Sequence, residues 1–103
     1  MGIIAHIKIK ITVTEVNQVV EALAELDTNI KSPWHAATVS ILELVLEKLL
    51  KKQIAKRHDI NPFKLELPYH EAYFLKEYLL KYNTIMDRYY VQTLIDKLDQ
   101  KLA

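Results

Sequence analysis

Histidines and carboxylates are the residue types best suited to bind a metal or transfer a proton, and this chain spaces them widely. The four histidines are His6, His35, His58 and His70. They show no i,i+4 pairing and have no nearby set of further ligands. The carboxylates fall on predicted outer faces, and no serine stands beside a histidine and an acid. Cysteine is absent, which excludes disulfides and cysteine-based zinc sites. We therefore expect no metal, no cofactor and no enzymatic activity.

Tyrosines are concentrated in the second half of the chain. All six lie there: Tyr69, Tyr73, Tyr78, Tyr82, Tyr89 and Tyr90. They are interleaved with Lys76, Lys81 and Arg88, and such a composition could stack on single-stranded bases. Tyrosine is also common at protein interfaces and at the edges of cores, and we favour the interface interpretation.

Lysines alternate with aliphatic residues over residues 6–14, which is the pattern of a half-buried strand. The branched residues of one face are Ile7, Ile9, Ile11 and Val13, and the other face carries His6, Lys8, Lys10 and Thr12. Residues 63–67 alternate in the same way and point Lys64 and Glu66 outward. Lysine on an exposed strand also discourages aggregation, so these lysines alone do not indicate a ligand.

Helices are predicted to follow both strands. Thr12 and Glu15 have capping-box spacing and begin the first helix. Ser32, followed by proline, caps a long helix predicted over residues 33–57. Pro68 ends the second strand, and another helix follows it. We predict that this helix breaks at Asn83-Thr84 and that Thr84 begins the last one.

The order strand-helix-helix therefore occurs twice, over about residues 6–57 and 63–103. A shift of 56 residues places Ile7 on Phe63 and Glu15 on Glu71, and for the second helix a shift of 52 places Ser32 on Thr84. The alternative is a coincidence of two amphipathic patterns. We predict one domain over residues 1–103, mainly α-helical with two short strands (α+β), in the order β-α-α-β-α-α. Its pseudo-twofold internal repeat would form a two-stranded ribbon covered by four helices, because a ribbon alone is marginally stable.

The length and composition of the chain fit a small globular domain. Half of the 103 residues are hydrophobic, and no segment approaches the roughly 20 apolar residues of a membrane-spanning helix. We therefore expect a soluble, cytoplasmic protein with no membrane partner. The net charge is only +1, so a site for a polyanion must be a local patch.

The alternating segments His6–Ile11 and Phe63–Pro68, each followed by a capped helix, resemble the ribbon-helix-helix family of DNA-binding proteins. Here two such units would be fused in one chain. The resemblance implies that outward side chains of the ribbon enter the major groove, which admits a two-stranded ribbon. It also implies that the amides at the start of each second helix hold phosphates, as helix N-termini do.

Carried over position by position, the resemblance implies base contacts by Lys8, Lys10, Lys64 and His6. It implies phosphate contacts at Ser32 and Thr84. Glu66 departs from this pattern, because a carboxylate repels phosphate, although it can accept a hydrogen bond from cytosine N4. The sequence thus predicts a small DNA-binding or accessory regulatory protein with double-stranded DNA as its partner. The alternative is a protein-interaction or oligomerisation module without a nucleic-acid role.

The long helix is apolar on most of its circumference. At the 52-residue shift Ile41, Leu44 and Val45 fall on polar residues of the last helix. The shared fold would then not require apolar residues there, and exposed aliphatic patches usually mark interfaces. We therefore predict a homodimer in which these three residues form a helix–helix contact, with Trp34 as a packing anchor. The alternative is that the helix crosses the middle of the monomer and buries them internally.

Overall fold

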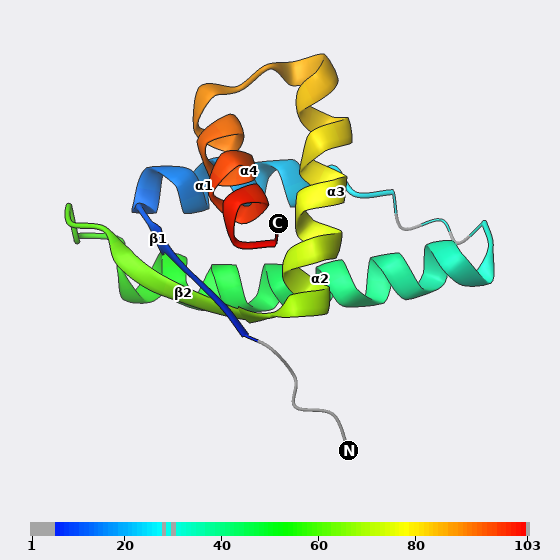
Figure 1. The fold of residues 1–103 in the computed structure, drawn as a ribbon, viewed down its shortest axis with the longest axis horizontal. Helices are drawn as coiled ribbons and strands as arrows, with labels where there is room; N and C mark the ends of the chain where they lie inside the picture. Colours follow the sequence, from blue (N-terminus) through cyan, green and yellow to red (C-terminus); the bar gives the residue numbers. More distant parts are fainter. Residues whose placement is uncertain (1–5, 28, 30, 103) are drawn as a thin grey trace.

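The computed structural model describes residues 6–27, 29 and 31–102. Its elements are β1 (His6–Ile11), α1 (Val13–Ala24), α2 (Pro33–Ala55), β2 (Phe63–Pro68), α3 (Tyr69–Met86) and α4 (Tyr89–Leu102). Figure 1 shows the two strands crossing the molecule as a narrow ribbon, with the helices packed beside it. The predicted mainly helical fold, in the order β-α-α-β-α-α with one two-stranded ribbon, is confirmed.

The ribbon is antiparallel and symmetric about its central pair. Ile9 lies opposite Leu65, and Ile11 lies opposite Phe63. Ile9 and Leu65 are equivalent positions of the two halves, because they are 56 residues apart. They also pair with each other, so the pseudo-twofold axis passes between them. The inward side chains of both strands are buried and the outward ones are exposed. A slip of one residue would turn the lysines into the core, so the hydrophobic pattern specifies this register.

The core lies between the inner face of the ribbon and the four helices. Its fully buried large side chains come from both strands and all four helices: Ile11, Leu42, Leu49, Leu65, Leu67, Leu75, Leu79, Leu94, Leu98, Val16, Val19 and Val45. Strand β1 ends at Ile11 rather than at residue 14, because Thr12 caps α1. The Thr12 hydroxyl accepts from the Glu15 amide at 3.2 Å, and the Glu15 carboxylate accepts from the Thr12 amide at 2.9 Å.

The predicted helix break at Asn83-Thr84 is wrong. Helix α3 continues to Met86, and the Thr84 hydroxyl donates to the Leu80 carbonyl inside it at 2.7 Å. The chain turns instead at Asp87, which adopts the left-handed conformation (φ 49°) that aspartate tolerates better than most residues. Buried Asn83 stabilises this turn, because its side chain accepts from the Arg88 amide at 2.6 Å and donates to the Arg88 carbonyl at 3.2 Å. The last helix therefore begins five residues later than predicted, at Tyr89 rather than Thr84.

The buried positions also correct the alignment of the second helices. The buried residues of α2 match those of α4 at a shift of 49 residues, not 52: Leu42 with Val91, Val45 with Leu94, and Leu49 with Leu98. A shift error of three residues keeps most of an apolar helical stripe in phase, which is why the sequence pattern did not separate the two alignments. Residues 33–39 of α2 then have no counterpart in α4. In Figure 1 this end of α2 extends away from the ribbon.

Two buried glutamates join the halves of the molecule. Glu15 of α1 binds Lys97 of α4, with nitrogen–oxygen distances of 2.8 and 2.9 Å. Glu71 of α3, its counterpart at the 56-residue shift, binds Lys48 of α2 at 2.7 Å. Lys97 in turn corresponds to Lys48 at the 49-residue shift. Each glutamate therefore takes its lysine from the other half, and the two contacts are related by the pseudo-twofold axis.

Acid should weaken the Glu15 contact. Burial alone would raise the pKa of Glu15, but hydrogen bonds from Lys97, the Thr12 amide and Thr93 outweigh it and lower the pKa below its ordinary 4.5. Because the folded-state pKa is the lower one, this stabilisation is complete above the unfolded-state pKa and is lost as pH falls through the folded-state value. We expect Glu15→Gln to lower the free energy of unfolding by about 1–3 kcal/mol at pH 7.

Urea unfolding of both proteins between about pH 7 and pH 3 measures this difference. The difference in unfolding free energy between Glu15→Gln and the wild type should become smaller as the pH falls. Glu43→Gln, which changes an exposed glutamate of α2, should leave the unfolding free energy nearly unchanged. A Glu15→Gln gap that stays constant across this range would show that the charge of Glu15 does not provide the stabilisation.

Candidate nucleic-acid interface

The outer face of the ribbon carries two cross-strand pairs of charged residues. Lys8 lies opposite Glu66, and Lys10 lies opposite Lys64. Glu66 is flanked by two groups: one oxygen lies 3.6 Å from the Lys8 ammonium and the other 3.6 Å from His6 Nδ1. All three side chains are about half exposed, so these contacts add little stability.

The second pair, Lys10 and Lys64, is wholly cationic. Both residues are exposed, and in the part of the chain that the structure describes neither ammonium forms an ion pair. Like charges directly opposite one another across a ribbon are destabilising. A bound anion would relieve that repulsion, so this pair is an electrostatically favourable place for one.

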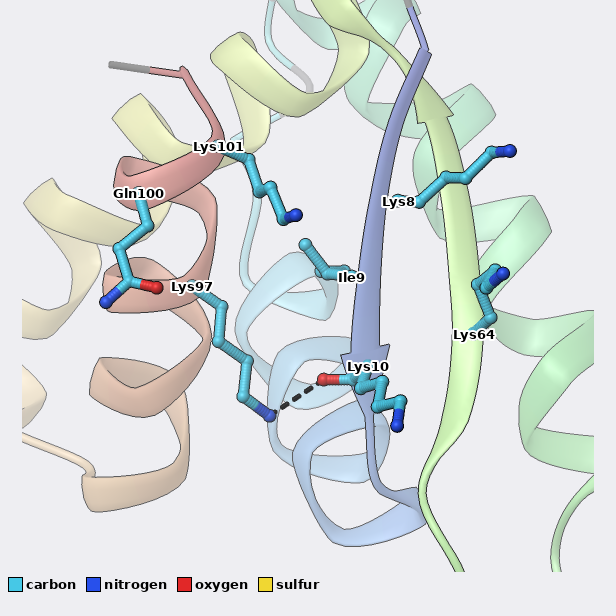
Figure 2. A pocket seen from close by; sticks show the side chains of 7 residues that line it. All are labelled: Lys8, Ile9, Lys10, Lys64, Lys97, Gln100 and Lys101. Atoms are coloured by element: carbon cyan, nitrogen blue, oxygen red, sulfur yellow. Dashed lines mark hydrogen bonds between the residues drawn. The ribbon is translucent and has the colours of Figure 1, made fainter.

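A groove runs between β1 and α4, on one edge of the ribbon. Its volume is about 480 Å³, and it is lined by Lys8, Ile9, Lys10, Lys64, Lys97, Gln100 and Lys101. Figure 2 shows Lys97 and Lys101 reaching from α4 toward β1, while Lys8 and Lys64 point away from α4. Lys97 also donates to the Lys10 carbonyl at 2.8 Å, which fastens α4 to the strand.

A second groove lies on the other edge, between β2 and α2. It measures about 470 Å³ and is lined by Lys48, Lys51, Lys52, Ala55, Lys64, Leu65 and Glu66. Its strand residues Lys64, Leu65 and Glu66 correspond to Lys8, Ile9 and Lys10 of the first groove at the 56-residue shift. Its lysines Lys48 and Lys52 correspond to Lys97 and Lys101 at the 49-residue shift. The ribbon is thus flanked by two lysine-lined grooves that the pseudo-twofold axis relates.

The helix lysines of these grooves were not among the predicted site residues. In α2 the cations near the C-terminal end have a sufficient explanation in the helix dipole, which conceals any second role. In α4 the incorrect shift paired Lys97 with Val45 rather than with Lys48. A usable signal was present, because Lys48 and Lys52 are spaced i,i+4 and so are Lys97 and Lys101.

The structure brings four of the predicted DNA contacts together and separates the other two. Lys8, Lys10, Lys64 and His6 share the outer face of the ribbon. Ser32 does cap α2, accepting from the His35 amide at 3.1 Å, but that end of the helix extends away from the ribbon (Figure 1). Thr84 lies in the last turn of α3, where the exposed carbonyls and the dipole disfavour phosphate. Thr84 therefore does not begin a helix as predicted, whereas the helix start at Ser32 is confirmed and its phosphate contact stays a prediction.

The predicted interface residues divide in a similar way. Val45 is fully buried in the core of the single chain, so it cannot be central to a contact between chains. The helix crosses the middle of the monomer at that position, as the alternative interpretation held. Ile41 is half-buried, whereas Leu44 is 49% exposed. Trp34 is 72% exposed, and its ring lies 5.8 Å from that of Phe74.

Three further findings concern the chain as a whole. Over residues 6–27, 29 and 31–102, no three histidines or acids are grouped as metal ligands would be. Within the same residues, the helices are too short or too polar to cross a bilayer. Comparisons with protein-family models, with curated proteins and with solved structures find no match to this chain.

Proposed function

We propose that this protein binds double-stranded DNA through the outer face of its ribbon, and that it acts as a small DNA-binding or accessory regulatory protein. The observation that carries the proposal is the exposed Lys10–Lys64 pair, on a face that Lys8 and the lysines of the two grooves extend. Two cations held opposite one another favour a polyanion, and a two-stranded ribbon has the width that a major groove admits.

The flanking grooves support a duplex as the partner. A ribbon lying in the major groove has one phosphate backbone on each side, and the two backbones are related by local twofold axes of the duplex. The lysine-lined grooves also lie one on each side of the ribbon and are related by its pseudo-twofold axis. Lys52 of α2 and Lys101 of α4 would then hold the two backbones, in place of the helix starts that the sequence predicted.

The test is a binding titration with a fluorescently labelled duplex of about 20 base pairs at low salt, followed by anisotropy. Counterion release makes such binding strong at low salt and weak at high salt. We expect saturable binding to the duplex and weaker binding to the corresponding single strand. The absence of binding to pooled duplexes of random sequence would reject the proposal. A preference for the single strand would also reject it and would favour stacking on the exposed tyrosines.

We also infer self-association through α2, and the observation that favours it is the exposure of Leu44. Half of this large aliphatic side chain faces solvent, next to half-buried Ile41 on the preceding turn. A pairing of α2 with its copy would cover both side chains. This second candidate is compatible with DNA binding, because neither residue lines the grooves beside the ribbon.

Leu44→Asp should convert a dimer into a folded monomer, because a charge in an apolar contact has no partner. Sedimentation velocity at several protein concentrations measures the change, and circular dichroism confirms the fold. Leu80→Asp, at a position on α3 that is 41% exposed, is the matched control and should leave the dimer intact. A wild type that sediments as a monomer at the highest concentration would contradict self-association.

A further inference from the structure

We propose that the ribbon reads DNA asymmetrically, with Glu66 selecting cytosine at the position where its symmetry mate Lys10 selects guanine. This inference rests on the proposed function and adds a specificity to the same surface. It starts from the register of the ribbon and from one difference between its two halves.

The outward side chains of the ribbon form two cross-strand pairs that the pseudo-twofold axis relates, and the two pairs differ at one position. The axis passes through the Ile9–Leu65 pair and carries the pair Lys8–Glu66 onto the pair Lys64–Lys10. Lys8 and Lys64 are thus equivalent and identical, whereas Lys10 and Glu66 are equivalent and opposite in charge. The flanking grooves share two equivalent lysine pairs but differ where Lys51 corresponds to Gln100. Within the paired strands, charge differs between the halves at Lys10 and Glu66.

Lysine and glutamate recognise opposite features of a base pair. A lysine ammonium only donates hydrogen bonds and pairs with the O6 and N7 acceptors of guanine. A carboxylate only accepts and pairs with the N4 donor of cytosine. A protein with twofold symmetry binds a site with the same symmetry. The two half-sites should therefore carry the same base at the positions that Lys8 and Lys64 contact. They should differ at the positions that Lys10 and Glu66 contact, with guanine in one half-site and cytosine in the other.

The alternation of β2 places Glu66 on the exposed face of the ribbon. Its two oxygens lie 3.6 Å from Lys8 and from His6, on the same face. A carboxylate on a surface facing phosphates reduces overall affinity, so its contribution would be discrimination between sequences. A contact of this kind typically discriminates its base by about tenfold.

The test is selection of binding sites from a pool of random duplexes, carried out with the wild type, Glu66→Gln and Glu66→Lys. The wild type should select an inverted repeat that is interrupted at one pair of positions. Glu66→Gln should change one cytosine to adenine, because an amide pairs with adenine N6 and N7, and should lose about tenfold in affinity for the wild-type site. Glu66→Lys should select guanine in place of that cytosine, so that both half-sites become the same and the inverted repeat is uninterrupted.

The inference and the proposed function fail in different ways. If all three proteins select the same sequence, Glu66 does not read a base and the inference is overturned, while the proposed function stands. If the wild type retains no duplex from the pool, both fail. If it retains duplexes without sequence preference, only the inference is overturned. Thermal unfolding of the variants is the control, because a substitution at this exposed position should barely change the melting temperature.

Discussion

Replacing Ile9 with lysine is expected to unfold the domain. Ile9 is 4% exposed and occupies the centre of the ribbon, where it faces the core. A lysine there would bury an unpaired ammonium, which costs several kcal/mol, and would also remove the apolar contacts of the isoleucine. A domain of this size is stable by only about 5–10 kcal/mol, so the two losses together should abolish most of the folded state.

Circular dichroism during heating measures the effect. The Ile9→Lys protein should show reduced helix content at 25 °C and no cooperative transition. Lys8→Ile is the matched control, because it exchanges the same residue types on the exposed face, and it should fold with a melting temperature close to that of the wild type. If Ile9→Lys melts cooperatively near the wild-type temperature, the register of the ribbon described above is wrong.

Removing the facing lysines of the ribbon is expected to weaken DNA binding by about tenfold or more without destabilising the fold. In the double variant Lys10→Ala/Lys64→Ala the surface loses the two cations that the structure places directly opposite one another. The free protein should be as stable as the wild type or slightly more stable, because the repulsion between these charges disappears with them.

The matched control for this double variant removes two lysines elsewhere. Lys31 and Lys81 are exposed and do not line the two grooves beside the ribbon. The double variant Lys31→Ala/Lys81→Ala has the same net charge as Lys10→Ala/Lys64→Ala, so a general effect of charge would weaken both equally. We expect anisotropy titrations at one salt concentration to show the tenfold loss only for the ribbon variant.

The ribbon was the part of the fold that sequence patterns predicted best. Alternation of apolar and polar residues specifies the register of a strand when one face is buried, because a slip of one residue would move every side chain to the opposite face. The starts of α1 and α2 were also predictable, since Thr12 and Ser32 precede residues that complete a recognisable cap. The start of α4 was not, because its turn depends on the buried side chain of Asn83 and on the left-handed backbone of Asp87.

The candidate site was predictable only where it lies on the strands. Lys8, Lys10 and Lys64 follow from the alternation alone. The lysines of the two grooves depend on how α2 and α4 rotate against the ribbon, and the buried contacts of Glu15 and Glu71 fix that rotation. These contacts join residues of different halves of the chain, and a local pattern carries no information about such pairs. For the same reason, the sequence could not tell whether Val45 is buried inside the monomer or in a contact between two chains.

The salt dependence of duplex binding, compared between the wild type and Lys10→Ala/Lys64→Ala, tests the central claim most directly. If the ribbon and its grooves hold DNA, the logarithm of the association constant should fall linearly with the logarithm of salt concentration, with a slope of about −0.9 for each phosphate neutralised. The double variant should bind more weakly and show a shallower slope, while Lys31→Ala/Lys81→Ala should match the wild type. A slope near zero for the wild type, or equal slopes and affinities for all three proteins, would contradict DNA binding at the ribbon.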